Sequence, residues 1–219
     1  LHVNVVDLQS PLSTAPVDMV VAADPGTCGA TVNYALPTAM DACDGSVPVQ
    51  AEAGSQAPGG SFPIGTTTVI LRASDNAGNI TEHSFTITVQ DTQAPTIVCP
   101  SDITVSVDPG VCGAHVTYSM PTATDNCATP VAAVNSDATQ VSGSLFAVGS
   151  TTVQLQSADA AGNIGTCSFS ITVMDYEAPA FTCPSDITMP TGLGLSGAYV
   201  AYVLPTANDP CDGVVAVTP

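Results

Sequence analysis

The sequence predicts an all-β fold built from tandem β-sandwich repeats. One pattern of residues recurs along the chain without gaps at a period of 84 residues, which is typical of an array of similar domains. Within one period the apolar residues alternate with polar ones over short segments that Pro and Gly turns separate, and no segment shows the 3.6-residue period of a helix. Many short strands in a unit of this size favour a small antiparallel sandwich.

The repeat boundaries follow from residues that return at the same place in each unit. Each unit opens on an aspartate and a short linker that ends in proline, so successive domains are expected to be semi-rigidly coupled. The positions shared by all three units are Asp7, Asp91 and Asp175; Tyr34, Tyr118 and Tyr202; Pro37, Pro121 and Pro205; and Asp41, Asp125 and Asp209. We therefore expect residues 1–6 to be the last strand of a preceding repeat, residues 7–90 and 91–174 to be two complete repeats, and residues 175–219 to be the N-terminal half of a third.

Three segments of the first complete repeat show the alternation of half-buried strands, at residues 30–36, 67–73 and 84–89. The side chains predicted to face inward are Ala30, Val32, Tyr34 and Leu36; Val69, Leu71 and Ala73; and Phe85, Ile87 and Val89. Between the last two segments, residues 74–79 read Ser-Asp-Asn-Ala-Gly-Asn, which predicts a hairpin tip. The third unit lacks the matching second half, so we expect it to fold poorly without further chain.

Composition places the chain outside the cell and excludes two classes of partner. Nineteen acidic residues against the single basic residue Arg72 give a net charge of -18, which disfavours nucleic acid and an anionic membrane surface. Eight cysteines and no tryptophan suit a secreted domain with disulfides. No apolar run has membrane-spanning length and Leu1 opens no signal peptide, so we expect any signal or anchor to lie elsewhere in a longer precursor.

A set of spaced motifs in the second repeat resembles the hyalin repeat, the HYR module of the immunoglobulin-like superfamily. The motifs are Ala-Pro-Thr-Ile-Val-Cys-Pro (94–100), Asp-Pro-Gly-Val-Cys-Gly-Ala (108–114), Pro-Thr-Ala-Thr-Asp-Asn-Cys (121–127), Ser-Gly-Ser-Leu-Phe-Ala-Val-Gly-Ser-Thr-Thr-Val (142–153), Ala-Asp-Ala-Ala-Gly-Asn (158–163) and Cys-Ser-Phe (167–169). The resemblance implies tandem immunoglobulin-like sandwiches with disulfides, in an extracellular, non-catalytic module of adhesive or matrix proteins. Similar modules occur in embryonic hyaline layers, complement-like mosaic proteins, bacterial surface proteins and the flagellar hairs (mastigonemes) of algae.

The loss of two cysteines from the first repeat suggests how the others pair. The second repeat has four cysteines, which allow three connectivities. The first repeat keeps only the second and third of them, with Ala15 and His83 at the first and fourth positions. Positions lost together are interpreted as partners, so the predicted disulfides are Cys28–Cys43, Cys112–Cys127 and Cys99–Cys167.

The third repeat does not follow this scheme. Cys183 would need a partner beyond residue 219, and Cys211 has Ser196 where its partner would stand. An odd cysteine in an oxidised protein suggests either a free thiol or an interchain bond, and the sequence leaves both open for Cys211.

Calcium is the metal that the acidic residues favour. Asp lies at each repeat boundary and again before each third cysteine, so the candidate ligands are Asp7, Asp41, Asp91, Asp125, Asp175 and Asp209. Carboxylates from both sides of a domain junction are suited to a hard cation, although Asp in turns usually bonds its own backbone and no EF-hand spacing occurs. His2, His83 and His115 follow no ligand spacing, so no zinc site and no other cofactor is expected.

The sequence also bears on glycosylation and on catalysis. Asn79-Ile80-Thr81 is an N-glycosylation acceptor on the predicted hairpin tip, relevant if the source is eukaryotic, and Gly165 replaces the threonine in the second repeat. No activated-nucleophile motif such as Gly-x-Ser-x-Gly occurs, so no enzyme activity is expected.

The sequence thus favours a structural protein of an extracellular filament, flagellar hair or matrix layer. Its tandem sandwiches would act as semi-rigid spacers with lateral contacts, and its expected partners are copies of itself or other extracellular structural proteins. The alternative is a cell-surface adhesin or stalk that binds a receptor or glycan. A third hypothesis makes the repeats accessory spacers of a large secreted enzyme.

Overall fold

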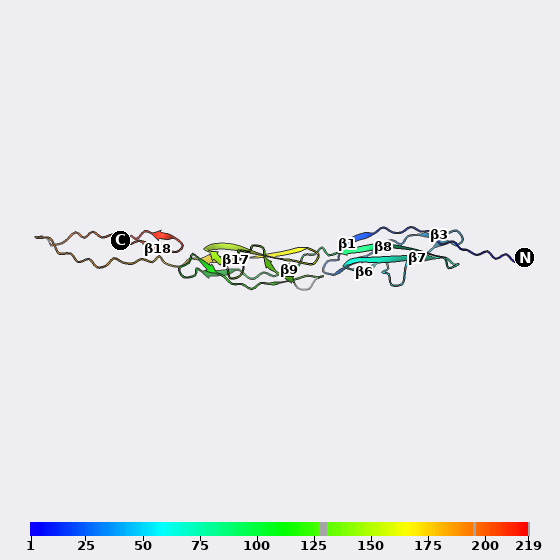
Figure 1. Ribbon diagram of the computed structural model, residues 1–219, viewed down its shortest axis with the longest axis horizontal. Helices are drawn as coiled ribbons and strands as arrows, with labels where there is room; N and C mark the ends of the chain where they lie inside the picture. The colour runs from blue at the N-terminus through cyan, green and yellow to red at the C-terminus, as the bar shows by residue number, and fades with distance from the viewer. Residues whose placement is uncertain (128–130, 195, 219) are drawn as a thin grey trace. The chain divides into compact units, whose positions relative to one another are not determined.

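The computed structural model describes residues 1–127, 131–194 and 196–218, and every regular element among them is a β-strand (Figure 1). The described part contains no helix, and hence none that is long and apolar enough to cross a membrane. The strands of the first repeat are β1 (Met19–Ala22), β2 (Gly29–Val32), β3 (Ala39–Asp41), β4 (Gly45–Val47), β5 (Val49–Ala51), β6 (Gly60–Pro63), β7 (Gly65–Ser74) and β8 (Ile80–Gln90).

The second repeat contains a matching set, followed by one hairpin in the third. Its strands are β9 (Thr96–Ile97), β10 (Ile103–Ser106), β11 (Gly113–His115), β12 (Thr122–Thr124), β13 (Val131–Ala132), β14 (Val134–Asn135), β15 (Leu145–Ala147), β16 (Gly149–Ala158) and β17 (Ile164–Met174); the hairpin is β18 (Ala207–Asp209) and β19 (Gly213–Val215). The chain forms two compact units: one holds Leu1–Thr96, Ala123–Val131 and Ser157–Gly165, and the other holds Ile97–Thr122, Ala132–Gln156 and Thr166–Pro219.

The first repeat is a sandwich of one larger sheet and two small ones. The larger sheet has the order β1-β8-β7-β5, with β1 parallel to β8 and the long β7–β8 hairpin antiparallel. The hairpin turns at the predicted tip, where Gly78 adopts φ 89°, a conformation that glycine tolerates without steric cost. The other sheets are the antiparallel pairs β2-β6 and β3-β4.

Apolar side chains from the strands fill the space between these sheets. The buried core is Ala30, Val32, Tyr34, Phe62, Val69, Leu71, Phe85, Ile87 and Val89. The ring of Tyr34 meets that of Phe85 edge to face, at 5.1 Å between centroids, and its hydroxyl donates to the Gln56 carbonyl at 2.6 Å. All but one of the side chains predicted to face inward are therefore buried, since Ala73 is buried as well.

The exception is Leu36, which is 42 % exposed. The strand predicted over residues 30–36 ends at Val32, because its partner β6 begins at Gly60, the residue paired with Val32. The chain beyond Val32 therefore has no strand to pair with, and Pro37 further disfavours regular pairing.

The strands of the second repeat pair in the same register as those of the first. Ile103 pairs with Ile171 as Met19 does with Ile87, since β10 runs parallel to β17 in a sheet of order β10-β17-β16-β14. Ala114 faces Phe146 across β11 and β15 as Ala30 faces Phe62 across β2 and β6. The all-β fold of tandem immunoglobulin-like sandwich repeats is thus confirmed.

The two ends of the chain lack this order. Residues 1–6 form no strand in this structure. Among the described residues of the third repeat, the strands are β18 and β19 alone. Tyr202 is 59 % exposed, whereas its counterpart Tyr34 is 6 % exposed.

Candidate metal centre at the repeat boundary

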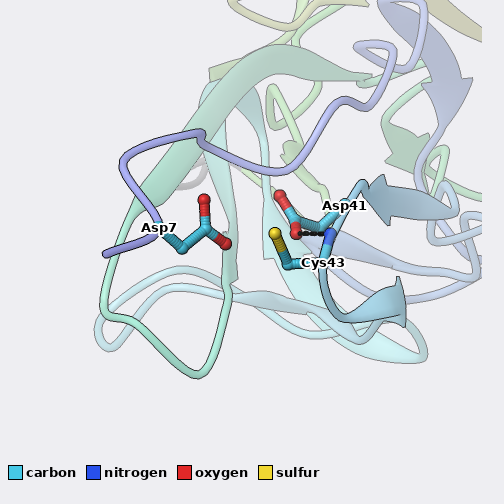
Figure 2. A group of neighbouring side chains, drawn as sticks. All are labelled: Asp7, Asp41 and Cys43. Carbon is cyan, nitrogen blue, oxygen red and sulfur yellow. Dashed lines mark hydrogen bonds between the residues drawn. The ribbon is translucent and has the colours of Figure 1, made fainter. Parts of the chain in front are cut away.

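The aspartate that opens the first repeat lies against the turn that joins β3 to β4. Figure 2 shows the carboxylates of Asp7 and Asp41 facing one another, with the thiol of Cys43 beside them. One carboxylate oxygen from each of Asp7, Asp41, Asp44 and Asp75 lies within 4.8 Å of the others. We call these four residues the boundary cluster.

Asp41 is fixed by its own turn. Its Oδ1 accepts hydrogen bonds from the main-chain amides of Cys43 at 2.8 Å and Asp44 at 3.1 Å, an Asx turn that closes the β3–β4 hairpin. The side chain is only 7 % exposed, and its Oδ2 is buried without a hydrogen-bond partner. The turn therefore leaves one carboxylate oxygen of Asp41 available to a ligand.

The tip of the β7–β8 hairpin supplies Asp75 and orients Asp7. Asn79 donates to Asp75 twice, from its main-chain amide at 2.7 Å and from its side-chain amide at 2.8 Å. The same side-chain amide reaches the Asp7 carbonyl at 3.3 Å. Burial alone would raise the pKa of the Asp75 carboxyl, but the hydrogen bonds from Asn79 and neighbouring amides outweigh burial and lower that pKa.

The two remaining acids of the boundary cluster differ in how they are satisfied. Asp44 accepts from both the main-chain and side-chain amides of Asn76, at 2.8 and 2.7 Å. Asp7 accepts one bond at Oδ1, from the Gln9 amide at 3.0 Å, while its Oδ2 is buried with no partner. Unpartnered oxygens of Asp7 and Asp41 thus belong to the same four-carboxylate group.

This arrangement calls for positive charge. Two neighbouring carboxylates with buried, unpaired oxygens are an unfavourable arrangement unless a cation supplies their missing partner. The one basic side chain of the sequence, Arg72, lies within β7 and forms no salt bridge among the described residues. Hard oxygen ligands in this number suit Ca²⁺.

Cys43 adds no thiolate to the site. The adjacent Asp7 carboxylate raises the pKa of the Cys43 thiol. The thiol therefore stays protonated at neutral pH, and a zinc-like thiolate site is disfavoured. The available donors are carboxylate oxygens.

The predicted aspartates also converge at the other two boundaries. Asp91 and Asp125 lie together beside Cys127, and Asp175 and Asp209 beside Cys211. Asp209 is 1 % exposed, its Oδ1 accepts from the Cys211 amide at 2.8 Å, and its Oδ2 has no partner. The structure thus brings together the aspartates that recur in the sequence. Asp75 was not among the predicted ligands, although it recurs as Asp159 in the second repeat.

The disulfides agree with only part of the predicted scheme. Cys99 is bonded to Cys167, with 5.7 Å between Cα atoms, and this is the predicted pair. Cys112, however, is bonded to Cys211 of the third repeat, with 4.7 Å between Cα atoms, and not to Cys127. Cys211 is therefore neither a free thiol nor an interchain link in this structure.

The predicted Cys28–Cys43 bond is absent as well, because the two cysteines lie near different boundaries. Cys43 sits in the Asp41 turn beside Asp7. Cys28 sits in the turn before β2, whose Gly26 amide donates to the Gln93 side chain of the next linker at 2.8 Å. Cys183 is exposed and unbonded.

Cys28 instead lies beside Cys127 of the second repeat. Burial, the neighbouring Cys28 thiol and the charge of Asp91 raise the pKa of Cys127 to about 12. The thiol of Cys127 is hence protonated at neutral pH.

The glycosylation motif at Asn79 overlaps a structural contact. The Asn79 side-chain amide is the donor to Asp75 and Asp7, and the Thr81 hydroxyl donates to the Pro11 carbonyl at 2.5 Å. Asn163 makes the same two contacts in the second repeat, to Asp159 at 2.8 Å and Asp91 at 3.2 Å, although Gly165 removes the motif there. The repeated asparagine therefore has a role in the fold that is independent of any glycan.

Taken with the fold, these boundaries define a class of protein: tandem, disulfide-braced β-sandwich modules. The HYR domain family matches residues 6–89 and 90–173. The chain belongs to this family.

Relatives support the assignment. The chain is 39% identical to hyalin of Lytechinus variegatus over 191 residues. The matched region makes up 84% of this chain and 34% of that hyalin. Over 215 residues the chain is 35% identical to hyalin of Strongylocentrotus purpuratus, with 94% of this chain and 17% of that protein covered. The chain thus spans about a third or less of the hyalins that it matches.

Among solved structures, Drosophila N-cadherin EC1-4 resembles the chain with a TM-score of 0.41 and 12% identity, over 76% of this chain and 50% of that one. This likeness is too weak to add to the fold assignment.

Proposed function

We propose that the chain is a non-catalytic, semi-rigid spacer of an extracellular filament, flagellar hair or matrix assembly, stiffened by calcium at its repeat boundaries. The proposal depends chiefly on two carboxylate oxygens that have no hydrogen-bond partner. One belongs to Asp7 in the linker, and the other belongs to Asp41 in the module that this linker enters. A cation between these residues would tie the linker to the module, because each side supplies one ligand.

Contacts on the other side of the linker support the same role. The turn before Cys28 binds Gln93 of the following linker, and the equivalent turn in the second repeat places the Gly110 amide 3.4 Å from both carboxylate oxygens of Glu177. Each linker would therefore be held by the module before it and the module after it. Domains coupled in this way transmit force and spacing better than domains on a flexible tether.

The proposal that the chain belongs to an extracellular assembly rests on its membership of the HYR family. Hyalin relatives and the absence of a catalytic motif favour an adhesive or matrix role outside the cell, where millimolar calcium fills sites of modest affinity. Copies of the same chain, or other extracellular structural proteins, are the proposed partners, through lateral contacts between arrays.

Calorimetry of the 219-residue chain tests the calcium site. Calcium at roughly 1 mM should raise Tm by on the order of 5 °C relative to chelator. Asp41→Asn should remove this rise without unfolding the protein, because Asn keeps the Oδ1 acceptor for the two turn amides. Glu82→Gln, at an exposed position on β8, removes one charge elsewhere and should leave the rise intact. A rise of equal size in Asp41→Asn would exclude the site.

A further inference from the structure

The bond between Cys112 and Cys211 defines a rule that a second pair of cysteines also satisfies. Cys112 is the second cysteine of its repeat, Cys211 is the third of the following repeat, and they are 99 residues apart. The same step from Cys28 leads to Cys127, which are the second cysteine of the first repeat and the third of the second.

The structure brings this second pair together. The Cys28 thiol lies beside that of Cys127, whose Sγ is 3.6 Å from the main-chain carbonyl of Thr27, the residue before Cys28. The side-chain amide of Asn126 donates to the same carbonyl at 2.5 Å. A hydrogen bond from the Gly26 main-chain amide to the Gln93 side chain also anchors the turn that carries Cys28. Both cysteines thus sit in segments that are already fixed against each other.

We propose that Cys28 and Cys127 form a disulfide in the secreted protein, so that successive repeats are joined by a ladder of covalent bonds across their boundaries. Forming it removes one proton from each thiol and transfers two electrons to an oxidising disulfide, which is reduced to two thiols; the disulfide of a secretory-pathway oxidoreductase or of oxidised glutathione is the oxidant required.

The ladder explains which cysteines each repeat keeps. The first repeat has lost the pair that braces a module internally, with Ala15 and His83 in its place, yet it retains Cys28. The third repeat has Ser196 instead of a second cysteine, yet it retains Cys211. The cysteines of the first repeat fit either pairing, but those of the third repeat discriminate: Cys211 without a second cysteine in its own repeat is expected only if second cysteines bond forward to third cysteines.

The single basic residue of the chain makes a direct test possible. Trypsin cleaves after Arg72 and at no other position, which yields residues 1–72, with Cys28 and Cys43, and residues 73–219, with Cys127. The protein is purified from an oxidising secretory host, alkylated in denaturant at acid pH to block free thiols, and digested without reduction. The two fragments should stay joined on a denaturing gel and separate when reductant is added, and peptide mapping should find Cys28 linked to Cys127.

Two variants identify the bond. Cys43→Ser should leave the fragments joined, whereas Cys127→Ser should release residues 1–72 without reductant. Release of that fragment from the unreduced wild-type protein, with Cys28 alkylated or bonded to Cys43, would overturn the proposal. Because peptide mapping of the wild-type protein decides the pairing by itself, misfolding of either variant cannot mask the answer. The result is independent of calcium, since digestion and mapping are performed in chelator.

Discussion

The side-chain amide of Asn79 donates to the main-chain carbonyl of Asp7, 72 residues earlier, and Asn163 repeats this contact with Asp91. The hairpin tip of each complete repeat therefore holds the linker by which the chain enters that repeat. The same asparagine satisfies both oxygens of a buried aspartate, so a single residue couples the tip, the linker and the acidic cluster.

Replacing Asn79 should destabilise the first repeat. Asn79→Ala removes the side-chain donor to Asp75 and leaves a buried carboxylate oxygen unsatisfied, which costs about 1–3 kcal/mol. Asn163→Ala should cost a similar amount in the second repeat. Urea unfolding measures both, with the exposed Asn33→Ala as control, expected to change stability by less than about 0.5 kcal/mol. No effect of Asn79→Ala would show that the contact contributes little to folding.

The same contact bears on glycosylation. A glycan on Asn79 would replace one hydrogen of the amide that bonds Asp75 and Asp7, so we expect the folded protein secreted from eukaryotic cells to carry Asn79 unmodified. Intact mass before and after a glycosidase that removes N-glycans checks this. A full-occupancy mass shift at Asn79 would contradict it.

Removing the Cys99–Cys167 disulfide should destabilise the second repeat. This bond closes a loop of 68 residues, for which chain entropy gives a contribution of about 4 kcal/mol, an upper value because measured gains are often smaller. The double variant Cys99→Ala, Cys167→Ala should therefore unfold at lower denaturant. Cys183→Ala, at an exposed unbonded cysteine, serves as the control and should leave the midpoint unchanged.

Stability should depend on the charge of Asp18. Hydrogen bonds from the main-chain amide (2.6 Å) and side chain of Thr86 lower the pKa of the Asp18 carboxyl from its usual 3.8. A lowered folded pKa means that the charged form contributes stability above pH 3.8, and that this contribution is lost as pH falls through the folded value. The difference in unfolding free energy between wild type and Asp18→Asn should thus shrink below pH 3.8.

Urea titrations at a series of pH values between about 6 and about 2.5 provide the measurement, because this range brackets the transition. The non-titrating variant Asn33→Ala should show no such trend. A difference for Asp18→Asn that grows as pH falls would contradict the assignment.

Local patterns predicted the parts of the fold that depend on neighbouring residues. The long hairpin followed from apolar alternation at Val69 and Ile87 around a turn-rich tip, since both signals are confined to a short stretch. The pairing of Asp7 with Asp41 followed from their recurrence at each boundary.

The sequence did not predict whether a side chain contacts residues of its own repeat or of the next repeat. Cys112 and Cys127 are close in sequence and recur together, but Cys112 bonds Cys211 because the turn that carries it lies at the boundary with the next repeat. A period fixes equivalent positions without distinguishing contacts inside a repeat from contacts between repeats. The one available signal was Cys211 itself, which persists where Ser196 replaces the second cysteine.

The most direct test of the spacer role is small-angle X-ray scattering of the oxidised 219-residue chain, in calcium and in chelator, for the wild type and Asp41→Asn. We predict that calcium shifts the distribution of interatomic distances of the wild type to longer values and lengthens its maximum dimension, and that Asp41→Asn shows a smaller response. Identical distributions with and without calcium in the wild type would contradict calcium-stiffened boundaries.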